Sequence, residues 1–141
     1  MDRRRFEIEL KVLLSRVGEN LFRFFNVNTD DTYVVMGART NRGNIYTLRI
    51  ELKGFPFDLP AVYVTQMLCD KEGNPLDGTS ASMHVLPSKN GWTRICHYGF
   101  DSWTPRVSIF KVYVKCRLWL EMYELHLQTA RPIDYYLNHQ D

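Results

Sequence analysis

The clearest alternation of apolar and polar side chains lies in the run Ile45-Tyr46-Thr47-Leu48-Arg49-Ile50-Glu51-Leu52. Because successive side chains of a strand point to opposite faces, the apolar residues from Tyr46 to Leu52 share one face. Turn residues at 41–44 precede this run, and a second apolar run at 32–39 precedes the turn. The pattern predicts two antiparallel strands joined by a short connection.

One more strand is predicted on each side of this pair. Residues 21–27 are rich in aromatic side chains and end in the turn residues 28–31, and residues 61–68 follow a segment with Pro56 and Pro60. The connections between these runs are short. We therefore predict a four-stranded antiparallel meander, in which consecutive strands are neighbours.

Helical periodicity marks both ends of the chain. Apolar residues recur at three- and four-residue spacing over 3–17, and Gly18 is suited to end that helix. A second apolar stripe runs from Ser108, a natural N-cap, to residue 127, and a short helix is predicted over 133–139. The order of elements predicts an α+β fold with helices packed on one sheet.

Composition limits the function classes. The 141 residues, of which 45% are hydrophobic and 24% charged, suit a single domain spanning 1–141. A net charge of +2 argues against nucleic acid as a partner. No apolar run is long enough to cross a membrane, and no signal-peptide core follows Arg3-Arg4-Arg5, so we expect a cytoplasmic protein with no membrane partner.

The cysteines argue against metal and disulfides. Cys69, Cys96 and Cys116 are an odd number, and none forms a Cys-x-x-Cys pair. His126 and His139 suggest no metal site either. We therefore predict reduced thiols, no metal and no cofactor.

Residues 69–104 lack any periodicity and are punctuated by glycine and proline. A segment of this length without secondary structure is unusual in a compact domain and is often functional. It contains Cys96, with His84 and His97 nearby in sequence. Because a thiolate is a strong nucleophile near neutral pH, Cys96 is the candidate nucleophile for acyl transfer.

Several segments in order carry a resemblance to the ubiquitin-conjugating enzyme (E2) family. They are Gly54-Phe55-Pro56-Phe57-Asp58-Leu59-Pro60-Ala61-Val62, His84, Arg94-Ile95-Cys96, Trp103-Thr104-Pro105 and Ser108-Ile109-Phe110-Lys111-Val112. The first is similar to the segment before strand four in that family, His84 to the His of its His-Pro-Asn tripeptide, and Cys96 to its catalytic cysteine. The resemblance covers essentially the whole chain and implies a UBC-like fold.

The resemblance implies that Cys96 carries the C-terminus of a partner protein as a thioester. The segments 119–124 and 132–137 look like those of prokaryotic E2-like proteins from antiphage operons. In one kind, CBASS, the partner is a cyclic-nucleotide synthase, a cGAS/DncV-like nucleotidyltransferase, and this is the reading we favour. In another, it is a ubiquitin-like protein with its own activating enzyme (E1) and protease.

One departure affects the expected chemistry. Val85 and Leu86 follow His84, where the family has Pro and an Asn that supports the oxyanion. Asn90 is a candidate replacement, or simply the turn residue of Asn90-Gly91. His84 either assists the oxyanion or thiol, or braces the loop as the matching histidine does in E2 enzymes.

The remaining candidates have two readings each. His97 either lines the groove or points away from Cys96, and Asp101 either orients an incoming amine or caps a turn. Trp103 and Pro105 are expected to be active-site scaffold. Arg3-Arg4-Arg5 form either a solvated face or, as the resemblance implies for the first helix, a docking surface for an E1-like enzyme.

Two other functions remain open. A catalytically silent E2 variant would act as an adaptor, which the missing Pro-Asn favours and Cys96 opposes. A cysteine hydrolase would need His84 or His97 within hydrogen-bond reach of Cys96.

Overall fold

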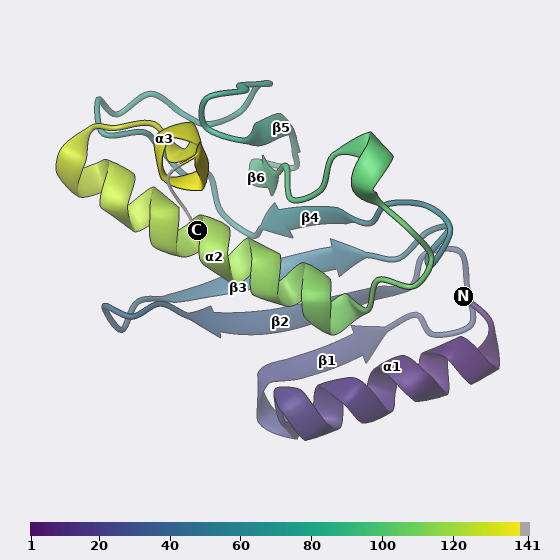
Figure 1. The fold of residues 1–141 in the computed structure, drawn as a ribbon. Helices are drawn as coiled ribbons and strands as arrows, with labels where there is room; N and C mark the ends of the chain where they lie inside the picture. Colours follow the sequence, from purple (N-terminus) through teal and green to yellow (C-terminus); the bar gives the residue numbers. More distant parts are fainter. Residues whose placement is uncertain (139–141) are drawn as a thin grey trace.

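A mixed arrangement of one antiparallel sheet and three α-helices is seen in the computed structural model, which describes residues 1–138 (Figure 1). Within these residues the sheet has six strands in the order β1-β2-β3-β4-β6-β5. The strands are β1 Phe22–Phe25, β2 Tyr33–Arg39, β3 Ile45–Glu51, β4 Ala61–Val64, β5 Val85–Lys89 and β6 Trp92–Ile95. The α+β class is therefore confirmed, whereas the predicted number of four strands is wrong.

The four predicted strands pair as a meander. β1 to β4 are consecutive antiparallel neighbours, and the register pairs Met36 of β2 with Leu48 of β3 and Leu48 with Val64 of β4. Along β2, and from Leu48 onward in β3, every second side chain is buried, including Val34 and Ile50. The alternation read from the sequence thus identified the core face correctly.

Two strands lie in the segment expected to have no regular structure. β5 and β6 form a hairpin whose turn is Asn90-Gly91, both with positive φ, 55° and 75°. β6 pairs with β4, which leaves β5 at the sheet edge. An edge strand tolerates Pro87, which has no N–H to donate. The hairpin brings Cys96, the residue after β6, against the central sheet.

The helices are α1 Arg3–Arg16, α2 Ile109–Thr129 and α3 Ile133–Asn138, and two 3₁₀ turns are η1 Glu19–Leu21 and η2 Phe100–Ser102. Asp2 caps α1 and Ser108 caps α2, each by accepting a hydrogen bond from a backbone N–H three residues on. All three helices were predicted to within two residues at their described ends. The predicted end of the third, His139, lies outside the described residues.

The core lies between the sheet and α2, which crosses one sheet face (Figure 1). Leu120 and Val112 of α2 pack with the inward side chains of the strands, and Leu13 of α1 and Ile133 of α3 join the same cluster. Among residues 1–138, no helix combines the length and the apolar character needed to cross a membrane.

Candidate functional site

Cys96 lies where β6 ends, and its backbone is fixed. Its N–H donates to the carbonyl of His84, with N and O 2.9 Å apart, and its side chain is partly exposed. The other thiols differ. Cys116 is fully buried in α2, and burial raises the pKa of its thiol, while Cys69 is exposed near the start of the 69–83 loop. Cys96 and Cys69 are thus the two cysteines with side chains at the surface, and the groove described next distinguishes them.

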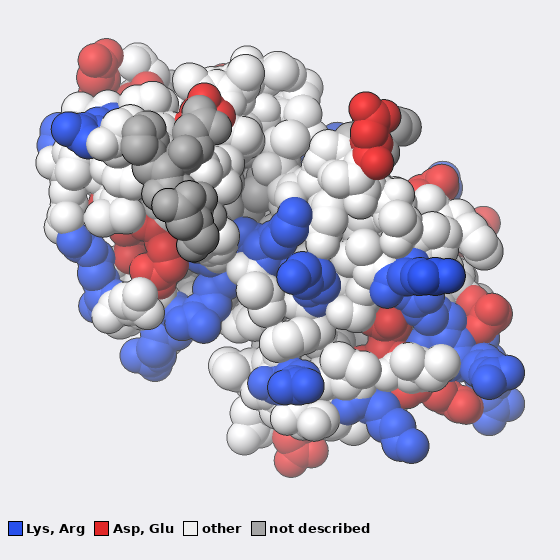
Figure 2. All heavy atoms as spheres, viewed as in Figure 1, with Lys and Arg blue, Asp and Glu red and all other residues white. Residues whose placement is uncertain are grey.

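The thiol lines a groove of about 440 Å³ between the end of β6 and the helices α2 and α3. Leu118, Trp119 and Met122 of α2 and Leu137 of α3 supply apolar walls. The polar side chains of the lining are those of His84, Cys96, His97, Tyr98 and Lys115. Figure 2 shows a hollow over α2, between α3 and η2, with Lys and Arg side chains along its α2 edge.

His84 is held by a carboxylate from α3. Its Nε2 lies 2.8 Å from Oδ1 of Asp134, and the Asp134 N–H donates to the carbonyl of Ser82 at 2.8 Å. His84 has a φ of +52°, a conformation that side-chain-bearing residues adopt only when their surroundings hold them there. Of the two roles open to His84, these contacts are the kind that bracing requires, and both roles stay predictions. Asp134 was not among the predicted site residues, although its place in the first turn of the third helix was evident.

His97 is neutral and connects two segments of the chain through a hydrogen bond. Its Nε2 donates to the carbonyl of Pro60 at 2.8 Å, while its Nδ1 is buried and has no hydrogen-bond partner among residues 1–138. Burial, with smaller contributions from the charges of Lys115 and Arg94, lowers the pKa of His97 to about 4. His97 therefore joins the segment after β6 to the start of β4 without carrying charge at neutral pH.

Neither histidine is a base for the thiol in this geometry. Among residues 1–138, Cys96 Sγ forms no hydrogen bond with the ring of His84 or His97, whose Nε2 atoms contact Asp134 and Pro60. A cysteine hydrolase needs such a pair. The arrangement suits thiol–thioester exchange better, because a thiolate leaving group makes that reaction less dependent on a base.

Lys115 is a groove residue that sequence reasoning missed. Its Nζ lies 3.7 Å from the centroid of the Tyr98 ring, and both side chains line the groove with Cys96. Burial and the nearby charge of Lys111 lower the pKa of Lys115. Its position in α2, one residue before the buried Cys116, gave no signal of this role.

Two predicted residues do not reach the groove. Asn90 lies in the turn between β5 and β6, and Asp101 is an exposed residue of η2. Neither belongs to the groove lining. Among residues 1–137, no side-chain amide lines the groove in place of the Asn that the E2 resemblance would require, and within the described part of the chain no group of His, Cys, Asp or Glu is arranged to hold a metal.

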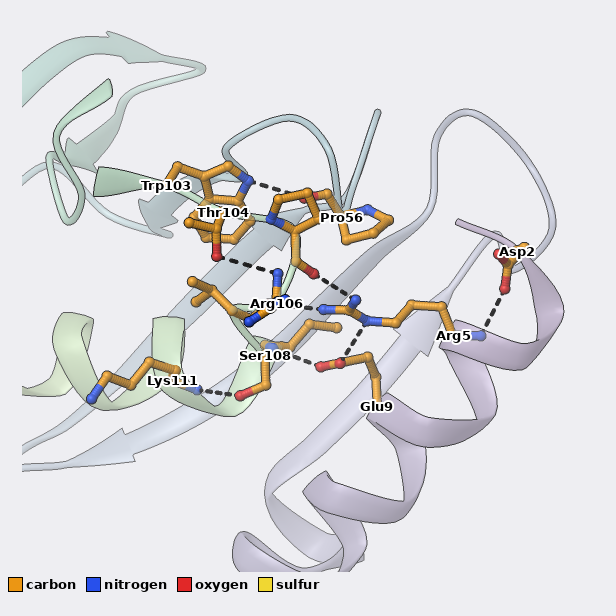
Figure 3. Close-up of polar contacts among 12 residues, drawn as sticks. Asp2, Arg5, Glu9, Pro56, Trp103, Thr104, Arg106, Ser108 and Lys111 are labelled. Carbon is orange, nitrogen blue, oxygen red and sulfur yellow. Dashed lines mark hydrogen bonds and ion pairs between the residues drawn. The ribbon is translucent and has the colours of Figure 1, made fainter. Parts of the chain in front are cut away.

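The predicted scaffold residues join three segments (Figure 3). Trp103 Nε1 donates to the carbonyl of Pro56 at 3.0 Å, and the Trp103 ring packs against Phe55 and Tyr98. The Pro105 carbonyl accepts from Arg5 Nη1 at 2.6 Å. The loop after Cys96 is thereby tied both to the segment before β4 and to α1.

Arg5 differs from its two neighbours. Besides Pro105, it donates to the carbonyl of Val107 and to Glu9, and Glu9 in turn accepts from the N–H of Ile109 (Figure 3). Arg3 and Arg4 are exposed. The basic run was expected to form a solvated or docking face. Arg3 and Arg4 lie on such a face, whereas Arg5 is engaged in holding the segment before α2.

The Trp103 hydrogen bond can be tested directly. We expect Trp103→Phe to lower the free energy of unfolding by about 1 kcal/mol or more, because the Pro56 carbonyl loses its donor and the smaller ring leaves space. Trp92→Phe is the control, since the Trp92 indole N–H has no hydrogen-bond partner among residues 1–138. Denaturant unfolding of both variants measures the difference, and equal losses would contradict it.

The site is therefore an accessible thiol in a partly apolar groove, braced by a His–Asp pair on one side and by a tryptophan and an arginine network on the other. Such an arrangement can accept an acyl group and hold it beside an amine. Comparisons with models of protein families, with curated proteins and with solved structures found no match to the chain.

Proposed function

We propose that the protein is an E2-like acyl carrier, in which Cys96 accepts the C-terminal acyl group of a partner protein as a thioester and then transfers or releases it. The observation that carries this proposal is the position of Cys96: it is the single thiol in the lining of the groove, its backbone is fixed, and no imidazole among residues 1–138 binds its sulfur. A UBC-like identity for the α+β fold is part of the same proposal.

The chemistry of the groove supports carriage over hydrolysis. Exchange between thioesters replaces one thiolate leaving group with another, so it needs little help from a base or an oxyanion donor. Amide formation with an external amine is harder, because the oxyanion needs donors and the amine must lose a proton. Among residues 1–137, no side-chain amide lines the groove and no histidine forms a hydrogen bond with the thiol, an arrangement that suits the first reaction well.

The partner is proposed from the resemblance described above. It is the C-terminus of a cyclic-nucleotide synthase of a CBASS antiphage system, or else a ubiquitin-like protein. Activation by an E1-like enzyme would use α1, where Arg4 and Ile8 border a groove of about 500 Å³ that also includes Phe57. Phe57 is 76% exposed, which is unusual for so large an apolar side chain and suits a contact with another protein.

The decisive experiment compares wild type with Cys96→Ser, each co-expressed with the proteins encoded beside it. We expect wild type to form an adduct that reductant cleaves and Cys96→Ser to form an ester that reductant does not cleave. The mass of the adduct identifies the carried protein. Cys69→Ser is the matched control, because Cys69 is also exposed but lies outside the groove, and it should behave as wild type.

An adaptor is the second candidate, favoured by the absence of a side-chain amide in the described groove lining. An adaptor would bind the partner's C-terminus in the groove without covalent chemistry. Partner binding that persists in wild type and in Cys96→Ser, with no adduct on either, would support the adaptor and remove the carrier proposal.

A further inference from the structure

The amine of Lys115 shares the groove with the thiol of Cys96. The two residues come from different elements, α2 and the end of β6, and both line the same space of about 440 Å³. Lys115 Nζ lies against the face of Tyr98, 3.7 Å from the ring centroid, so the side chain follows the groove wall. An acyl group on Cys96 would therefore enter a space that already contains a primary amine.

Burial and the charge of Lys111 both disfavour the ammonium form of Lys115, whereas its contact with the Tyr98 ring favours it. Among residues 1–138, Lys115 forms no ion pair with a carboxylate that would hold it in the charged form. The other titratable groups of the lining are His84, held by Asp134, and His97 and Tyr98. Partial burial and a neighbouring cation are the two conditions that increase the neutral, nucleophilic fraction of a lysine.

We propose that Lys115 is an internal acceptor, which takes the acyl group from Cys96 and becomes acylated itself. The inference rests on the proposed function, because the Cys96 thioester is the substrate. The Nζ lone pair attacks the thioester carbonyl carbon, a C–N bond forms and the C–S bond breaks. Cys96 leaves as a thiolate, and the proton lost from Nζ restores the thiol. The products are an amide on Lys115 and free Cys96, with no other reactant.

The groove lining favours an internal acceptor over an external one. Among residues 1–137, no side-chain amide lines the groove to stabilise the tetrahedral intermediate. An amine held in the same groove as the thioester reacts at a higher effective concentration than an amine in solution, and this advantage offsets weak stabilisation of the oxyanion. An amine from another molecule would have no such advantage.

The test uses a small thioester, so it does not depend on identifying the partner. The full chain is incubated at neutral pH with N-acetylglycyl thioester of 2-mercaptoethanesulfonate, which imitates a C-terminal glycyl group. Thioesters are then cleaved with hydroxylamine, and the remaining amides are mapped by peptide mass spectrometry. In wild type we expect an amide on Lys115, and in Cys96→Ala we expect about tenfold less of it or lower.

Two lysine variants complete the test. Lys115→Arg should carry the probe as a thioester on Cys96 without forming the stable amide. Lys111→Arg is the matched control, because Lys111 lies one turn earlier on the same helix and outside the groove lining. In this variant Lys115 should still become acylated.

Three outcomes would overturn the inference. Equal acylation of Lys115 in wild type and Cys96→Ala would mean that the probe modifies the lysine directly. A thioester on wild-type Cys96 with no amide on Lys115 would remove the acceptor role and leave the carrier proposal intact. Failure of Cys96 to form a thioester with both the probe and the co-expressed partner would remove both.

Discussion

We expect Glu9→Ala to lower the free energy of unfolding by about 3 kcal/mol and Glu7→Ala to lower it by less than about 1 kcal/mol. Both carboxylates lie in α1 and both pair with an arginine four residues earlier in the helix. The Arg3–Glu7 side chains are 89% and 62% exposed, whereas those of Arg5 and Glu9 are 20% and 3% exposed. The two pairs therefore differ mainly in burial.

The larger loss at Glu9 follows from the groups that it satisfies. One carboxylate oxygen accepts from the N–H of Ile109, the first residue of α2, at 2.7 Å, and the other accepts from Arg5 Nε at 2.9 Å. Alanine would leave a buried N–H without an acceptor and a largely buried guanidinium without its counter-charge. At Glu7 water replaces the lost partner, so little changes.

Denaturant unfolding of both variants measures this difference. Glu9→Gln separates the effect of the lost charge from that of the lost hydrogen-bond acceptor. Glutamine keeps an acceptor for the Ile109 N–H and removes the charge. The free energy of unfolding of Glu9→Gln should therefore lie between those of wild type and Glu9→Ala. Similar losses in Glu7→Ala and Glu9→Ala would mean that the arginine network contributes no more than a surface pair. Because the network also fixes Pro105 and Val107, Glu9→Ala should make the loop after Cys96 more accessible to protease.

Local patterns identified the elements that have a long, regular period. α1 and α2 follow from apolar spacing and capping residues, and β2 and β3 follow from strict alternation. The hairpin of β5 and β6 has neither signal. Its strands have five and four residues, and Pro87 interrupts the first. Its pairing with β4 joins residues about thirty positions apart, and a local pattern does not contain that information.

Site residues could be predicted from the sequence where a local signal marks them. Cys96, His84 and Trp103 were identified because residues near them in sequence marked the segment. Asp134, Lys115 and Glu9 act through contacts with residues distant in sequence, and nothing beside them shows this. Glu9 is the clearest example, since its polar side chain predicts an exposed helix position but it is only 2% exposed. Its partner at Ile109 is one hundred residues away.

Acid should destabilise the folded protein through His97. Burial lowers the pKa of His97 from its usual 6.5 to about 4, so the folded protein binds this proton less readily than the unfolded chain. As pH falls below 6.5, the unfolded chain becomes protonated at His97 while the folded protein does not. The contribution of His97 to stability is thus present above pH 6.5 and is lost as pH falls towards 4, a change of about 3 kcal/mol at most.

His97→Gln isolates this contribution. A glutamine amide can donate to the Pro60 carbonyl as Nε2 does, but it does not titrate. We expect the free energy of unfolding of wild type to fall more steeply between pH 7 and pH 4.5 than that of the variant. Parallel pH profiles would contradict the prediction, whatever the stability of the variant at neutral pH.

The consequence for the site follows from the position of His97 next to Cys96. Protonation would place a positive charge in a buried position near Lys115 and Arg94, the two cations that already disfavour it. Because the charged ring is better solvated outside this position, protonation favours states in which the ring is more exposed and the segment that carries the thiol has moved. Alkylation of Cys96 followed against pH in His97→Gln and in wild type would reveal this coupling, because only wild type has a titrating ring at this position.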